Sequence, residues 1–201
     1  MQTVRQIERY WTARQYDRLT RSLLIARPEA SERAAIELGY AVPAAALALI
    51  RLDELTQAHH PLNLKLIRTI LAAQEGDGGW GDPLTTAVCL RALMLGRGQG
   101  VAVERGIAYL ATLQQTGGIW PSVGVRRTAA DPFVSAFILF HLADQPAFQS
   151  AVRITEAADW FDRHHSTLDA ATLKPWHRAS LRCRIARIQS LATNWSEKIA
   201  G

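Results

Sequence analysis

Two segments of the chain, QEGDGGW at residues 74–80 and QQTGGIW at residues 114–120, share a glutamine in the first place, a glycine in the fifth and a tryptophan in the seventh. Glycine lets the backbone turn with a positive φ. The indole can fill the space between successive helical hairpins, and the glutamine amide can satisfy peptide groups left open at helix ends. We therefore predict a structural repeat that joins one hairpin to the next. Its residues are Gln74, Gly78, Trp80, Gln114, Gly118 and Trp120.

Helix starts recur in step with these segments, at Pro43, Pro83 and Pro132. Proline suits the first turn of a helix, where its missing N–H would have no partner anyway. Asp82 and Asp131 precede two of these prolines and can cap the open N–H groups of the first turn. Apolar residues follow at helical spacing. We predict buried inner helices from these prolines and more exposed outer helices before each glutamine.

The repeat resembles the QW repeats of squalene–hopene and oxidosqualene cyclases, in the prenyltransferase and squalene-cyclase repeat superfamily. The second copy carries, in the family's order, Arg105-Gly106, Tyr109-Leu110, Gln114 and Gly118-Ile119-Trp120. The first copy keeps the glutamine and the Gly-Gly-Trp but lacks the basic–glycine start. The resemblance covers about residues 41–144 and implies antiparallel helix pairs arranged around an axis. It also implies packing roles, and no catalytic role, for the glutamines and tryptophans.

Helical spacing continues on both sides of the repeat. Further helices are expected around residues 4–23, 29–38, 147–163 and 175–193, which gives about nine in all. That is fewer than a closed ring of hairpins requires, so we expect an all-α fold of antiparallel hairpins in a partial or distorted α/α toroid. The length of 201 residues suits a single α-helical domain over residues 1–201. In the last helix, the predicted packed face consists of Leu181, Ile185, Ile188 and Leu191.

The termini and the cysteines bear on location. The N-terminus has no apolar run typical of a secretory signal, and no segment approaches the roughly 20 apolar residues of a membrane span. We expect a cytoplasmic protein without a membrane span. Cys89 and Cys183 lie in helical, partly apolar stretches, so we expect buried free thiols and no disulfide.

The chemical motifs of the resembling families are missing. The Asp-x-Asp-Asp acid of the cyclases and the Asp-Asp-x-x-Asp cluster of ionising terpene synthases are absent, and Asp53-Glu54 and Asp159-Trp160-Phe161-Asp162 do not have their spacing. Ser135 has no nucleophile elbow around it. Asp162, His164 and His165 could in principle contribute metal ligands, but no Cys-x-x-Cys or His-x-x-x-His pattern supports them. We predict no catalytic residue, no metal and no cofactor.

These observations favour a non-catalytic helical-repeat protein that binds or regulates another protein, for example as an inhibitor of a larger assembly. The chain has a formal charge of +5, and a basic stretch near its C-terminus suggests contact with an acidic partner. The predicted contact residues are Arg178, Arg182 and Arg187. One alternative is an isoprenoid-handling enzyme or carrier with a pocket between the inner helices, near Ala87, Leu90, Phe133 and Phe137. The other is a basic nucleic-acid-associated protein.

Overall fold

The computed structural model describes residues 30–56, 61–95 and 100–200, and the side chains of residues 30–40, 186, 187 and 189–200 lie outside the described part. The helix expected around residues 4–23 falls outside the described residues, and so do two adjacent histidines, His59 and His60. The chain divides into two compact units, residues 1–40 and 41–201. In the first unit the described residues form only the beginning of one helix. The second unit holds everything that follows.

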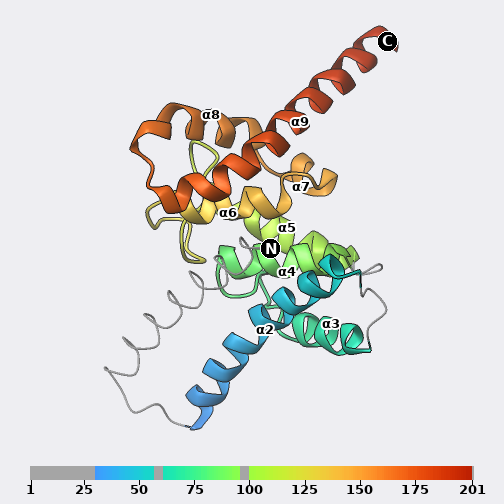
Figure 1. Cartoon of the computed structure of the whole chain (residues 1–201), viewed down its shortest axis with the longest axis vertical. Coiled ribbons are helices and arrows are strands. Elements are labelled where there is room, and N and C mark those ends of the chain that lie inside the picture. The colour runs from blue at the N-terminus through green and yellow to red at the C-terminus, as the bar shows by residue number, and fades with distance from the viewer. Residues whose placement is uncertain (1–29, 57–60, 96–99, 201) are drawn as a thin grey trace. The chain divides into compact units, whose positions relative to one another are not determined.

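The described part of the chain is all-α, which confirms the predicted class, and contains eight α-helices and one 3-10 turn. Figure 1 labels them α2 to α9. Their bounds are α2 Ala30–Glu54, α3 Leu62–Ala72, α4 Pro83–Leu95, α5 Gly100–Leu113, α6 Pro132–Leu142, α7 Pro146–Ala151, α8 Ile154–His164, η1 His165–Thr167 and α9 Ala170–Ala200. An arrangement of these helices around a toroid axis stays a prediction.

The core of the second unit centres on α6, which packs against α4 and α9. Both α4 and α6 are buried on nearly all sides, because nearly all of their side chains are apolar or small. Helix α5 packs against α4 and α7, and α8 packs against α9. As expected, Asp131 caps α6: its Oδ1 accepts hydrogen bonds from the N–H groups of Phe133 and Val134, at 2.9 and 3.1 Å.

The two glutamine–tryptophan loops make matching hydrogen bonds. Trp80 donates from its indole to the carbonyl of Ile70 at 2.7 Å, and Trp120 donates to that of Leu110 at 2.8 Å. Each indole therefore closes the C-terminal end of the preceding outer helix. The backbone N–H of Trp120 donates to the hydroxyl of Ser135 at 2.8 Å, which ties the loop to the first turn of α6.

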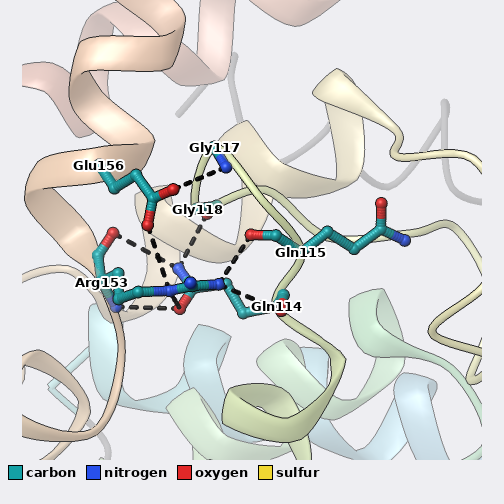
Figure 2. Close-up of polar contacts among 6 residues, drawn as sticks. All are labelled: Gln114, Gln115, Gly117, Gly118, Arg153 and Glu156. Carbon is teal, nitrogen blue, oxygen red and sulfur yellow. Dashed lines mark hydrogen bonds and ion pairs between the residues drawn. The ribbon is translucent and has the colours of Figure 1, made fainter.

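The second loop is also held by the start of α8 (Figure 2). Gln114 accepts a hydrogen bond from the N–H of Arg153 at 2.9 Å, and the Arg153 guanidinium donates to the carbonyl of Gln115 at 2.7 Å. Glu156 accepts from the N–H of Gly117 at 2.7 Å. The first loop has a similar clamp, because Arg105 donates to the carbonyls of Glu75 and Gly76 at 2.9 and 3.1 Å. Each loop thus fixes the next outer helix.

Two expected helix boundaries are wrong. No helix begins at Pro43, because α2 runs through it; proline inside a helix is tolerated at the cost of one backbone hydrogen bond. The single helix expected over 147–163 is two, α7 and α8, with extended backbone at Val152. The break has a physical cause, because the N–H of Arg153 bonds to the Gln114 side chain instead of to a helical carbonyl.

Replacement of Gly118 by alanine is expected to lower the free energy of unfolding by at least about 2 kcal/mol. The residue has a φ of 73°, and an added Cβ would lie 2.4 Å from the backbone nitrogen of Ala157. Urea denaturation measures the change. Gly76→Ala is the control, because that glycine has no positive φ and its added Cβ would meet no atom within 4 Å. Equal losses in the two variants would contradict the close packing of the loop on α8.

Candidate interaction surface on the last helix

Helix α9 packs through the side that carries Trp176, Ala179 and Cys183, all of them buried. The Trp176 ring stacks on Phe161 of α8, with ring centroids 4.4 Å apart. The small side chains of Ala179 and Cys183 lie on the same side of the helix, because residues three, four and seven apart share a face. This side carries the buried apolar contacts of α9 with the rest of the unit.

The aliphatic row Leu181, Ile185 and Ile188, which we expected to pack, is exposed to 64%, 48% and 66%. The sequence prediction for this helix is therefore wrong for these three residues, and the side chain of Leu191 lies outside the described part. The reason is competition between two apolar faces. The face with tryptophan and small residues buries a large ring and allows close helix approach, so it packs inward and turns the aliphatic row outward.

The exposed aliphatic row has an arginine on each flank. Arg178 and Arg184 are both exposed and lie on opposite sides of the row at helical spacing. We name this surface, formed by Leu181, Ile185, Ile188, Arg178 and Arg184, the α9 ridge. In Figure 1 the C-terminal part of α9 extends away from α6, α7 and α8. The side chains of the five ridge residues are all exposed.

The charged residues along the stretch of α9 that carries the ridge are of one sign. No acidic residue occurs between Asp169 and Glu197, whereas five basic residues do. They are Lys174, Arg178, Arg182, Arg184 and Arg187. Such a local excess attracts negatively charged groups and repels a second basic surface. The ridge therefore combines an apolar centre with positive flanks.

Of the three predicted contact residues, only Arg178 lies on the ridge. Arg182 points toward α6, where its guanidinium donates to the carbonyl of Phe140, lies 5.3 Å from the centre of that residue's ring and pairs with Asp144 at 3.5 Å. Arg91 of α4 approaches the same Asp144 carboxylate at 3.7 Å. Arg182 therefore joins α9 to the core. The side chain of Arg187 lies outside the described residues.

Beside this ion cluster lies His141, a histidine buried between the rings of Phe137 and Phe140. Its Nε2 has no hydrogen-bond partner among the described residues. Burial, together with the positive charges of Arg91 and Arg182, lowers the pKa of His141 from 6.5 to about 3. The imidazole is therefore neutral at physiological pH and acts as part of the core.

The other groups considered for chemistry have structural surroundings. Ser135 donates from its hydroxyl to the carbonyl of Asp131 at 2.8 Å, within the start of α6. Both cysteines are free and buried, as predicted. Burial raises the pKa of Cys89, and it raises that of Cys183 to about 12, so neither thiol ionises readily to a nucleophilic thiolate.

The two histidines near the end of α8 have different neighbours. His164 contacts the carbonyl of Trp160 through Nδ1 at 2.8 Å and stacks on the Trp160 ring, whereas His165 lies beside His177 of α9. No group of three or more His, Cys, Asp or Glu side chains arranged for a metal occurs in the described part of the chain. Sequence reasoning missed the contact of His177 with His165, because the two residues are twelve positions apart and a turn lies between them.

Sequence reasoning also missed Arg184 and Arg153. Arg184 could have been predicted as a contact residue from its position beside the aliphatic row, but only if that row had been expected to face outward. No local sequence pattern indicates the role of Arg153, because its partner, Gln114, lies 39 residues earlier in the chain.

Comparisons of the chain with protein-family models, curated proteins and solved structures find no match. None of the described helices is both long enough and apolar enough to cross a membrane. The likeness to QW repeats accordingly stays a resemblance of two segments.

We expect the free energy of unfolding to decrease as the pH falls, because the buried ring of His141 must stay neutral in the folded protein. The folded protein keeps this ring neutral down to a pKa of about 3, whereas the unfolded chain binds a proton below about 6.5. Stability contributed by the neutral ring is present above pH 6.5 and is lost as the pH falls. Between pH 7 and pH 5 the wild-type protein should lose about 2 kcal/mol more than His141→Gln.

Urea denaturation at the two pH values measures this difference. Gly76→Ala serves as the control, because an added Cβ there would meet no atom within 4 Å and the variant should keep the wild-type dependence. An unchanged pH dependence in His141→Gln would show that the buried ring is not responsible.

Proposed function

We propose that this chain is a non-catalytic helical binding protein that docks another protein through the α9 ridge and so regulates it. The observation that carries the proposal is the exposed line of Leu181, Ile185 and Ile188 on a helix whose opposite side is anchored in the core. The complementary partner surface has an apolar groove or helix face with acidic residues at its edges. An amphipathic helix with glutamates beside its leucines has this chemistry.

The energies of such a contact favour moderate, specific binding. Full burial of an aliphatic side chain of this size contributes about 1.5–3 kcal/mol, so three of them form a small hot spot. Part of that gain offsets the entropy lost on association. Arg178 and Arg184, on the two flanks, orient an acidic partner and speed its approach more than they tighten the complex.

The scaffold suits a regulatory role. Two matching loops connect successive helices, which is how helical repeats build extended surfaces that present contact residues. A protein that covers a helix or groove of its partner competes with whatever else binds there. Inhibition of a larger assembly, by occupation of one of its interfaces, is the regulatory mode that this arrangement favours.

The rival functions have less support. Nucleic-acid binding would use the arginines but has no need of an aliphatic row on the same surface. An isoprenoid pocket between the inner helices would use Ala87, Leu90 and Phe137, which are buried in the helices that pack together as α4 and α6. Neither alternative accounts for the ridge.

The ridge should bind a fluorescein-labelled acidic peptide, designed as an amphipathic helix with leucines on one face and glutamates on both flanks. Fluorescence anisotropy gives the dissociation constant. We expect Leu181→Ser to weaken binding about tenfold. Burial of a leucine side chain contributes about 1.5–3 kcal/mol, and a loss of about 1.4 kcal/mol corresponds to a tenfold change in the dissociation constant. Leu64→Ser is the matched control, since Leu64 of α3 is exposed to 67% against 64% for Leu181.

Three results would argue against the proposal. Equal binding of a peptide with lysines in place of the glutamates would show that charge complementarity does not contribute to binding. Equal effects of Leu181→Ser and Leu64→Ser would show that the peptide does not bind at the ridge. Tight binding of a DNA duplex, steeply weakened by salt and unaffected by Leu181→Ser, would favour the nucleic-acid function instead.

A further inference from the structure

A second group of exposed side chains lies between η1 and the N-terminal part of α9, just before the α9 ridge. His165 in η1 and His177 in α9 approach each other through their Nε2 atoms, which are 3.2 Å apart. The two rings are nearly parallel, with centroids 5.5 Å apart and planes inclined by 29°. Both residues are exposed, so water or a dissolved ion can reach the two nitrogens.

The approach of the two histidines is fixed by buried neighbours. Phe161 lies one helical turn before His165, and Trp176 immediately precedes His177. These two aromatic side chains are buried and stacked on each other. The backbones that carry the histidines are therefore held close by the core.

We propose that His165 and His177 together bind a divalent transition-metal ion such as Zn²⁺ or Ni²⁺ through their Nε2 atoms. Two metal–nitrogen bonds of about 2.1 Å at a tetrahedral angle hold their nitrogens about 3.4 Å apart. The observed 3.2 Å is close to this value. Imidazole nitrogen suits this class of ion, whereas Mg²⁺ and Ca²⁺ prefer oxygen ligands.

The neighbouring groups define the rest of the site. His164 does not join the pair: its ring stacks on the Trp160 indole, with ring centroids 4.2 Å apart, and its Nδ1 contacts the carbonyl of Trp160. Within the described residues no third His, Cys, Asp or Glu completes a cluster. Water fills the remaining positions of the ion. A site with two protein ligands and open positions exchanges its metal readily.

Metal binding has a structural consequence. An ion held by both residues links the turn after α8 to the exposed side of α9, in addition to the aromatic contact beneath it. Because the unfolded chain does not hold the two nitrogens together, the ion binds the folded state preferentially and stabilises it. This inference stands independently of the proposed protein partner.

Isothermal titration calorimetry of the tag-free, full-length protein with NiCl₂, and separately with ZnCl₂, tests the site. We expect one equivalent to bind, and His165→Ala or His177→Ala to weaken that binding by more than about tenfold, since even outer-shell partners of a metal contribute that much. His164→Ala is the matched control and should bind as the wild type does. A double variant, His59→Ala with His60→Ala, controls for the other adjacent histidines.

Thermal unfolding gives a second readout. The metal should raise the melting temperature of the wild type and of His164→Ala, but not of His165→Ala or His177→Ala, and circular dichroism should show that all variants fold. Loss of binding in both single variants with retained folding supports the site. Unchanged binding in either one, or no binding to the wild type, overturns it.

Discussion

The surface chemistry of this protein depends on which side of α9 is buried. Trp176, Ala179 and Cys183 pack inward, and the stack of Trp176 on Phe161 fixes the rotation of the helix about its axis. That rotation decides three things. It turns the aliphatic row of the α9 ridge outward, it brings His177 beside His165, and it directs Arg182 toward the Asp144 carboxylate. A different rotation would remove all three arrangements.

The scaffold beneath α9 depends on hydrogen bonds that the side chains of Gln114 and Arg153 make to each other's backbone groups. Gln114 satisfies the N–H of Arg153, and the Arg153 side chain returns hydrogen bonds to the carbonyls of the loop. Buried peptide groups are costly when unpaired, so this exchange fixes where α7 ends and α8 begins. Because α8 carries Phe161, the loop contacts reach the α9 ridge through a continuous set of packed elements.

Local patterns predicted the local structure well. The all-α class, the cap at Asp131 and the buried thiols follow from spacing, composition and short-range chemistry alone. The errors at Pro43 and in α9 arose where two local solutions compete and tertiary packing decides between them. Helix α9 has two apolar faces in its sequence, and only the presence of Phe161 opposite selects one. The contacts of Arg153 and His177 are invisible in sequence because their partners lie far along the chain.

The rate of thiol alkylation tests the orientation of α9 most directly. Single-cysteine variants would carry Leu181→Cys or Ile188→Cys with both native cysteines replaced by alanine, and be compared with a protein that keeps only Cys183. We expect fast labelling at both ridge positions and labelling of Cys183 only on unfolding, since that thiol is buried. Fast labelling of native Cys183 with protected ridge positions would show that the aliphatic row packs inward, and would contradict the account.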